Sequence, residues 1–215
     1  MANFKCFWNS NNFDIIFIVC FLLIFFYWIL YVCKIYYWLM HRLKKKYYFI
    51  KNFNTTELKN LNSNTGVIYR NYEKMPVITE LLKLRTFCKR KGIKLYLSNN
   101  IQLAIKLGFD GAYIPSFNKS LRHLNYKLKK NFRILGSAHN IKEIRLKEKQ
   151  KVSLIFISSI FKKNKNYLGL YKFINLEKLT GINIIALGGI NRRNLKILSL
   201  TKCNGFAGIS YFKKV

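Results

Sequence analysis

The chain has 215 residues, of which 51% are hydrophobic, and 39 Lys and Arg against 8 Asp and Glu give it a formal net charge of +31. This length allows one domain, or one domain with an appendage, and the apolar content excludes a disordered chain. The charge favours anionic ligands such as phosphates, or an anionic membrane face. Coding bias towards Lys, Asn, Ile, Phe and Tyr explains the basic residues equally well, because they are scattered and form no basic helix. We therefore expect no nucleic acid as a partner.

An uncharged apolar run, Ile15–Cys33, lies near the N-terminus and is followed by aromatic residues and the basic stretch His41–Lys46. At ~1.5 Å per residue the run reaches roughly 28 Å, close to the width of a bilayer core. The pattern predicts a tail at residues 1–14, a single transmembrane helix at 15–40, and a basic flank at 41–46 that keeps the following domain in the cytoplasm. A cleaved signal peptide fits poorly. A buried core helix is the alternative, and a chain starting at Met40 would be a soluble cytoplasmic domain.

Residues 47–215 alternate short β-rich apolar runs with helical patterns, which indicates repeated βα units and a parallel sheet. We predict eight strands, at Tyr47–Phe53, Gly66–Arg70, Ile93–Ser98, Gly111–Pro115, Phe132–Ser137, Val152–Ser158, Ile182–Leu187 and Gly205–Ser210. Helices are predicted at Val77–Lys91, Ile101–Leu107, Leu121–Lys130 and Asn191–Leu200. The pattern favours an α/β fold of the (β/α)8, or TIM, barrel class, with a short chain and a vestigial last helix. An open doubly wound sheet is the structural alternative.

The last two predicted strands end in small residues. One ends at Gly188 and Gly189, and the other continues through Gly208 to Ser210. In a (β/α)8 barrel, the loops after strands seven and eight commonly bind a phosphate, and glycine lets the backbone approach an anion closely. The five cysteines share no metal-ligand or disulfide spacing, so we expect a reduced compartment.

Four segments, in order, resemble the thiamine-phosphate synthase and thiazole tautomerase superfamily. They are Gly66–Tyr72, Gly111–Ile114, Leu135–His139, and Ala186–Ile190 leading to Ala207–Ser210. The resemblance implies a transferase of thiamine biosynthesis that joins a hydroxymethylpyrimidine diphosphate to a thiazole phosphate and releases pyrophosphate. It also implies a homo-oligomer.

The resemblance assigns roles to individual residues. Arg70 would hold the diphosphate, and Ser137 would contact pyrophosphate. Gly188, Gly189, Ile209 and Ser210 would cradle the thiazole phosphate. Lys163 or Lys165 would supply the lysine of the loop after strand six, with Lys165 our choice. His139 matches the proton shuttle of the tautomerase branch, and histidine as a class titrates near neutral pH. A solvated strand-end arginine, a capping serine and a packing histidine are the plain structural alternatives.

The departures from the family concern its magnesium ion. Two aspartates bind Mg²⁺ in the synthase, whereas this sequence has Asn99 and Asn118 at those places, which we assign to substrate binding. An amide supplies one neutral oxygen and cannot balance a dication as a carboxylate does. Asp110 matches a structural position. The cofactor is therefore left unassigned, and lysine could replace Mg²⁺ in neutralising the diphosphate.

Three functions follow as hypotheses. The first is the synthase-type transferase, and the second is a tautomerase-like isomerase that uses His139 and needs no metal. The third is a degenerate barrel that binds a phosphorylated ligand at the membrane without catalysis.

Overall fold

The computed structural model describes residues 21–34 and 45–212. The chain divides into two compact units, Met1–His41 and Arg42–Val215. In the first unit, residues 21–34 are helical, and the large apolar side chains from Phe21 to Val32 are exposed. No helix among the described residues is both long enough and apolar enough to cross a bilayer. The predicted transmembrane helix, 15–40, lies partly outside the described residues.

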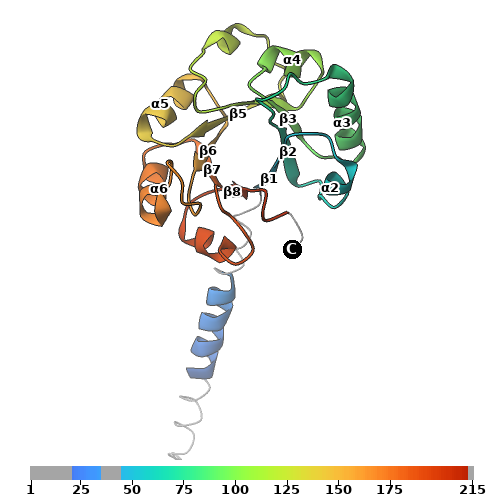
Figure 1. Ribbon diagram of the computed structural model, residues 1–215. Coiled ribbons are helices and arrows are strands. Elements are labelled where there is room, and N and C mark those ends of the chain that lie inside the picture. Colours follow the sequence, from blue (N-terminus) through green and yellow to red (C-terminus); the bar gives the residue numbers. More distant parts are fainter. Residues whose placement is uncertain (1–20, 35–44, 213–215) are drawn as a thin grey trace, which may run out of the picture. The chain divides into compact units, whose positions relative to one another are not determined.

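The second unit is a closed barrel of eight parallel strands in chain order, in which β8 pairs with β1 (Figure 1). The strands are β1 (Lys45–Ile50), β2 (Thr65–Tyr69), β3 (Leu95–Ser98), β4 (Gly111–Ile114), β5 (Arg133–Ala138), β6 (Leu154–Ser158), β7 (Asn183–Leu187) and β8 (Gly205–Ala207). The eight predicted strands and the TIM-barrel fold are confirmed, and the open doubly wound sheet is excluded. β1 begins at Lys45, inside the stretch predicted as a basic flank.

Side chains alternate between the inside and the outside of the barrel, as the strand period of two requires. In β1, Tyr47 and Phe49 point into the interior cluster, whereas Tyr48 and Ile50 pack against the outer helices. The interior is filled by large side chains, with Phe156 in edge contact with Tyr47 at 5.0 Å and with Tyr113 at 5.4 Å between ring centroids. The interior of the barrel is therefore a packed core and not a channel.

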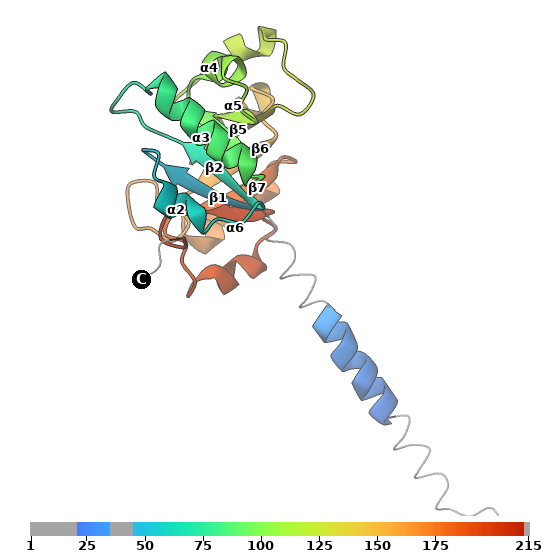
Figure 2. The ribbon, with the colours of Figure 1, turned by 90° about the vertical axis from the view of Figure 1, so that its right-hand side faces the viewer.

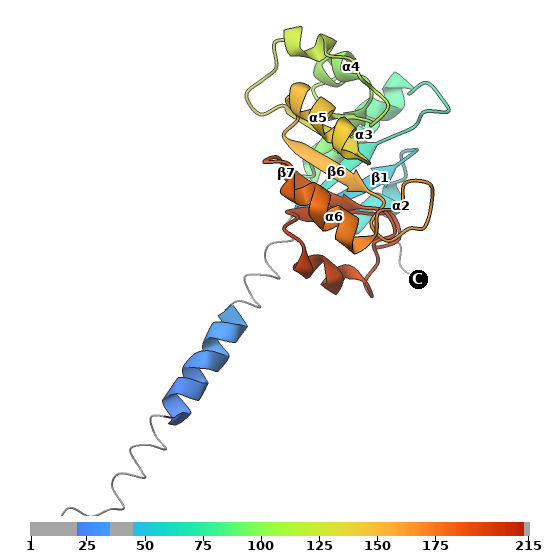
Figure 3. The same ribbon diagram turned by 90° about the vertical axis from the view of Figure 1, so that its left-hand side faces the viewer.

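Helices surround the strands, as the two side views show (Figures 2 and 3). They are α2 (Thr55–Lys59), α3 (Ile78–Arg90), α4 (Ile101–Lys106), α5 (Ile141–Lys149) and α6 (Gly169–Lys178), with 3-10 helices η1 (Arg122–Asn125) and η2 (Leu195–Leu200). The predicted helices at 77–91 and 101–107 are confirmed to within a residue at each end. The prediction of a helix over Leu121–Lys130 is wrong, because only η1 forms there. The prediction of an α-helix over Asn191–Leu200 is also wrong. The stretch begins with a turn, and only the 3-10 helix η2 follows it.

The chain closes the barrel without an eighth helix among its described residues. After β8, Tyr211 and Phe212 fold back as a turn over the outer face. The Tyr211 ring lies 4.6 Å from the Phe206 ring, and the Phe212 ring lies 5.1 Å from the Tyr48 ring, measured between centroids. Two aromatic side chains thus cover the seam between β8 and β1, where a helix would usually pack.

Candidate active site

The floor of the barrel mouth is made by Phe49 and Tyr113, two interior aromatic residues whose rings meet edge to face at 5.4 Å. Arg70 follows β2 directly, and its guanidinium carbon lies 4.5 Å from the centroid of the Phe49 ring. Because Phe49 belongs to the interior cluster, this stacking directs the arginine over the barrel axis. Arg70 is half-buried, and in residues 45–212 its guanidinium pairs with no carboxylate. Its donors can therefore bind an anion at the mouth.

Ser137 lies beside this floor. It stands in β5 and is buried, and its side chain acts to lower the pKa of the Tyr113 phenol. Burial raises the pKa of Tyr113 to about 12, which the serine and the Arg70 charge partly oppose. The phenol therefore stays protonated at neutral pH. Ser137 and Arg70 approach the same tyrosine, so the structure brings these two predicted residues together.

Tyr72, to which the sequence analysis assigned no role, connects neighbouring loops at the mouth. Its hydroxyl lies 2.8 Å from the Ser98 Oγ, at the end of β3. Its ring meets the exposed Phe117 ring, in the loop after β4, with centroids 5.4 Å apart. This bridge joins three consecutive loops. This contact could not be predicted from the sequence, because it depends on the closure of the barrel.

The loop after β7 is shaped by two glycines in the left-handed region, Gly188 at φ 103° and Gly189 at φ 75°. A Cβ atom at Gly188 would lie 2.3 Å from the Ser159 Oγ, and one at Gly189 would lie 2.6 Å from the Lys162 backbone nitrogen. The loop therefore requires glycine at both positions. Within residues 45–212, the N–H groups of both glycines donate to no protein acceptor, so they are available to an anion.

The loop after β8 lies next to it, since Leu187 pairs with Ala207. The Gly208 N–H donates to the Tyr47 carbonyl oxygen at 3.2 Å and is therefore used by the barrel itself. Ile209 and Ser210 are exposed, and their N–H groups donate to no acceptor in the part of the chain that is described. The four predicted cradle residues thus form two adjoining loops with unused backbone donors.

Asn191 does not begin a helix, although the sequence suggested that it could. Its side-chain Oδ1 accepts hydrogen bonds from the N–H groups of Arg193, at 2.9 Å, and Asn194, at 3.0 Å. Asn194 in turn donates through Nδ2 to the Gly189 carbonyl oxygen at 2.8 Å. These bonds make a side-chain-capped turn. Its effect on the site is to fix the carbonyl of Gly189.

His139 follows β5 at the same mouth and is held from both sides. Its N–H donates to the Glu143 Oε2 at 2.7 Å, and its Nδ1 lies 2.7 Å from the Ser158 carbonyl oxygen. Glu143 also receives a bond from the side chain of Asn140, the residue that caps α5. Because a carbonyl only accepts, Nδ1 carries the proton in the neutral ring, and Nε2 is the basic nitrogen.

Lys163 and Lys165 are both exposed in the loop after β6. Within residues 45–212 neither forms an ion pair or a hydrogen bond. The structure therefore does not favour one lysine over the other, and the choice of Lys165 stays a prediction.

Asn99 and Asn118, from the loops after β3 and β4, are brought into contact. The Asn118 Nδ2 donates to the Asn99 Oδ1 at 2.7 Å. The Asn118 Oδ1 accepts from the Ser120 N–H at 2.8 Å. All strands are parallel, so these residues share one rim of the barrel with Arg70, Ser137, His139 and the two glycine loops.

The two glycine loops, Arg70 and His139 therefore share a single mouth. The family model described as "Thiamine monophosphate synthase" matches residues 54–212. The chain belongs to this family.

Relatives agree with this family. The chain is 28% identical over 152 residues to "Thiamine-phosphate synthase" of Hydrogenobaculum sp. (strain Y04AAS1), and the matched region covers 68% of this chain and 71% of that protein. It is 29% identical over 143 residues to "Putative thiamine-phosphate synthase 2" of Aquifex aeolicus (strain VF5), and this match covers 62% of this chain and 75% of that protein. The solved structure of thiamine phosphate pyrophosphorylase from Pyrococcus furiosus superposes with a TM-score of 0.65 at 20% identity, covering 79% of this chain and 87% of that one.

The magnesium ion implied by the thiamine monophosphate synthase family does not fit the residues present here. The side-chain oxygens of Asn99 and Asn118 are neutral, and both already accept hydrogen bonds. Glu73, in the loop after β2, is paired with Lys51 at 2.7 Å. Among residues 21–34 and 45–212, no group of three His, Cys, Asp or Glu residues could hold a metal ion. The described part of the chain therefore has no carboxylate pair at the place where the family has its two aspartates.

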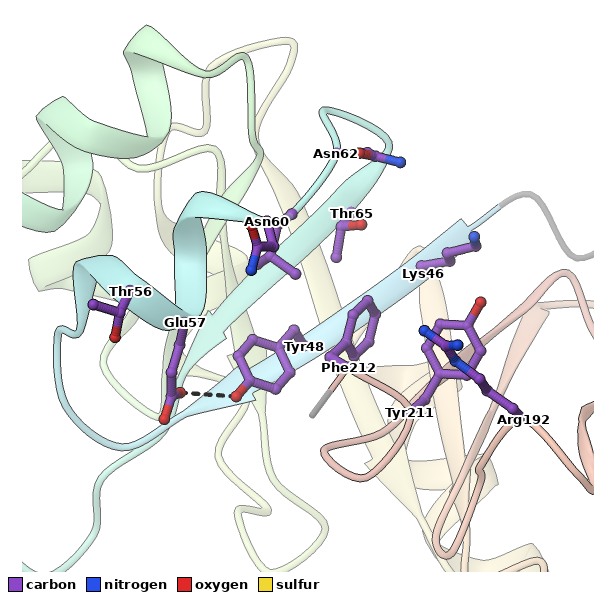
Figure 4. A pocket seen from close by; sticks show the side chains of 11 residues that line it. Lys46, Tyr48, Thr56, Glu57, Asn60, Asn62, Thr65, Arg192, Tyr211 and Phe212 are labelled. Atoms are coloured by element: carbon purple, nitrogen blue, oxygen red, sulfur yellow. Dashed lines mark hydrogen bonds between the residues drawn. The ribbon is translucent and has the colours of Figure 1, made fainter. Parts of the chain in front are cut away.

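A separate cavity of about 580 Å³ lies on the outside of this family member's barrel, between α2 and the turn after β8 (Figure 4). Tyr48, Tyr211 and Phe212 line it, and the Tyr48 hydroxyl donates to Glu57 at 2.8 Å. The Lys46 Nζ lies 5.7 Å from the centroid of the Tyr211 ring, and Arg192 lines the same cavity. The cavity occupies the region that an eighth helix would cover, and none of the predicted site residues lines it.

Proposed function

We propose that this protein is a thiamine-phosphate synthase-type transferase, which joins a hydroxymethylpyrimidine diphosphate to a thiazole phosphate. The bond between the pyrimidine methylene carbon and the diphosphate oxygen breaks, and pyrophosphate leaves with the electron pair. The thiazole nitrogen then gives its lone pair to the methylene carbon, and a C–N bond forms. The product is thiamine phosphate with a positively charged thiazolium ring.

The chain's own residues would act by positioning and by charge. Arg70 would bind the diphosphate and stabilise the charge that develops on leaving pyrophosphate, with Ser137 as a further donor. The backbone N–H groups of Gly188, Gly189 and Ser210 would hold the thiazole phosphate. Charge neutralisation by arginine and lysine would replace a carboxylate-bound metal, because Asn99 and Asn118 do not fit one.

One observation carries the proposal: unused backbone donors of the last two loops share a rim with an arginine that no carboxylate neutralises. An anion-binding mouth of this kind suits two phosphorylated substrates.

The test incubates the full chain with both substrates and measures thiamine phosphate and pyrophosphate, with and without EDTA. We expect turnover that EDTA does not abolish. EDTA-sensitive turnover would remove the metal-free part of the proposal. Phosphate binding without turnover would favour the degenerate barrel instead.

The second candidate, a tautomerase-like isomerase, is favoured by the geometry of His139. The bond from Nδ1 to the Ser158 carbonyl at 2.7 Å leaves Nε2 as a base at the mouth. His139→Ala and Arg70→Ala separate the two functions. Loss of activity in Arg70→Ala supports the transferase, and dependence on His139 alone supports the isomerase.

We also propose that residues 15–40 anchor the protein in the membrane with the barrel in the cytoplasm. Support comes from the uncharged run Ile15–Cys33 and from the exposed apolar side chains of residues 21–32. Membrane fractionation tests this, since a chain starting at Met40 would remain in the soluble fraction. A homo-oligomer is expected from the family, and sedimentation of the purified chain would test it.

A further inference from the structure

The connection between β4 and β5, residues 115–132, has only the short η1 where a (β/α)8 barrel usually has a full helix. A loop of this kind does not satisfy its own carbonyl groups, and buried carbonyls need donors from elsewhere. In this loop the donors come from side chains of another element, α5 and its end.

Lys147 of α5 is the main donor. Its side chain is fully buried, and its Nζ donates to the carbonyl oxygens of Pro115, at 2.8 Å, and Asn118, at 3.1 Å, and to the Gln150 Oε1, at 2.8 Å. The aliphatic part of the side chain passes over Gly136 of β5, where a Cβ atom would lie 2.9 Å from the Lys147 Cδ. The glycine makes the space in which the lysine reaches the loop.

Gln150 and His123 complete the support. The Gln150 Nε2 donates to the carbonyl oxygens of Asn118, at 3.0 Å, and Ser120, at 2.9 Å. The buried His123 lies with Nε2 2.8 Å from the Gln150 carbonyl oxygen. All three polar side chains are buried, and the bonds of Lys147 and Gln150 converge on the same carbonyl of Asn118.

Asn118 connects this buried cluster to the mouth. Its side chain donates to Asn99 at 2.7 Å, and the Asn99 N–H donates to the Tyr113 carbonyl at 2.8 Å. Lys147 therefore holds the backbone of Asn118, and the side chain of Asn118 is in turn bonded to the side chain of Asn99. No carboxylate hydrogen-bonds to the ammonium within residues 45–212; the charge of Glu143, on the same helix, acts on it from further away.

We propose that Lys147 is a positioning residue for the diphosphate substrate, which holds Asn118 and Asn99 at the mouth and places a buried positive charge behind them. The proposal rests on the proposed function for the identity of the anion. A cation buried away from water and from carboxylates acts over a longer distance than a surface lysine does. It therefore stabilises an anion at the place where the family has its metal-binding aspartates.

The experiment measures the binding of inorganic pyrophosphate to the full chain by titration calorimetry. Lys147→Met keeps most of the aliphatic side chain and removes the ammonium, and Lys149→Met, on the exposed side of the same helix, is the matched control. We expect Lys147→Met to weaken pyrophosphate binding by about tenfold or more, as loss of a charged donor should, and Lys149→Met to leave it within about twofold. Equal affinities of the two variants would overturn the proposal.

A double-mutant cycle separates positioning from a general loss of structure. In an Asn118→Ala background, the further loss from Lys147→Met should be clearly smaller than in the native chain. A full additional loss in that background would overturn the link through Asn118. In turnover, the KM for the pyrimidine diphosphate should rise more than kcat falls.

A measurement on the native chain covers the case in which Lys147→Met fails to fold. Hydrogen exchange of residues 115–126 should slow when pyrophosphate saturates the protein, and unchanged exchange would count against the proposal. Neither this measurement nor calorimetry needs turnover. If pyrophosphate binds through Lys147 but no thiamine phosphate forms, the proposed function fails while the positioning role stands.

Discussion

The two sides of the barrel mouth present different kinds of groups. After β7 and β8, the donors are backbone N–H groups, and their arrangement depends on two glycines at positive φ. After β3, β4 and β5, the groups at the mouth are side chains: Asn99 and Asn118 are hydrogen-bonded to each other, and the Nδ1 of His139 lies 2.7 Å from the Ser158 carbonyl oxygen. Binding through backbone N–H groups requires only small residues in the loop, whereas a magnesium site requires carboxylate side chains at particular positions. This explains how the chain can keep the two loops that we propose to hold a phosphate although it has Asn99 and Asn118 in place of a carboxylate pair.

The largest expected effect comes from Gly189→Ala, which breaks the backbone side. The new Cβ would lie 2.6 Å from the Lys162 nitrogen at a residue with φ 75°, so the loop must move. We expect the free energy of unfolding to fall by about 2–4 kcal/mol and phosphate binding to be lost. Denaturant unfolding and phosphate titration measure this. Gly181→Ala is the control, because its Cβ would meet nothing within 4 Å. Similar results for the two variants would refute a required glycine.

Arg70→Ala tests whether the mouth needs a cation between its two sides. Loss of a charge-assisted bond should weaken pyrophosphate binding and transferase activity by about 10- to 100-fold, with stability changed by less than about 1 kcal/mol. Arg90→Ala, at the exposed end of α3, should change neither. If Arg70→Lys restored full activity, the bidentate role of the guanidinium would be wrong.

The side-chain side should respond to pH through Lys147. Burial lowers the pKa of this lysine to about 8, with the Glu143 charge partly opposing the effect. Between about pH 8 and its unfolded pKa near 10.4, the unfolded chain binds more protons than the folded one, so the Lys147 contribution to stability rises with pH. Relative to Lys147→Met, the free energy of unfolding should rise by at most about 1.4 kcal/mol per pH unit in that window. Urea unfolding at several pH values measures it, and a flat difference would contradict the shift.

The smallest effect is expected at the opposite rim, from Asp110→Asn. Asp110 precedes β4 and accepts bonds from the Lys94 Nζ and the Leu95 N–H, both at 2.9 Å. Thermal or urea unfolding should show a loss of about 1 kcal/mol, because one charged bond is weakened. Pyrophosphate affinity should stay unchanged, as a purely structural position requires. A change in affinity would mean that the two rims are coupled.

The strands and the shared rim could be predicted from the sequence because they depend on local apolar runs and on the order of the loops. The arginine and the two glycines follow strands directly, so their places were fixed once the strands were known. The helix predicted over Leu121–Lys130 does not form, and the loop that contains this stretch is held instead by bonds to the carbonyl oxygens of Pro115, Asn118 and Ser120. That support comes from Lys147 and Gln150, more than fifteen residues away. One feature of the sequence could have indicated the buried lysine. Lys147 stands three residues after Ile144, so that both residues lie on the inner face of α5.

The aromatic cover over β8 and β1 has a consequence for the motions of the protein. β8 has only three residues, and two side chains, those of Tyr211 and Phe212, stand outside it, whereas β5 and β6, for example, are each followed by an α-helix. Local opening follows the least-packed elements, so the barrel should separate first along this seam. Gly208 donates across the same seam to Tyr47, immediately before the loop of Ile209 and Ser210. A phosphate bound by that loop would therefore stabilise the pairing of β8 with β1. The barrel would then open less often at this seam when the ligand is bound.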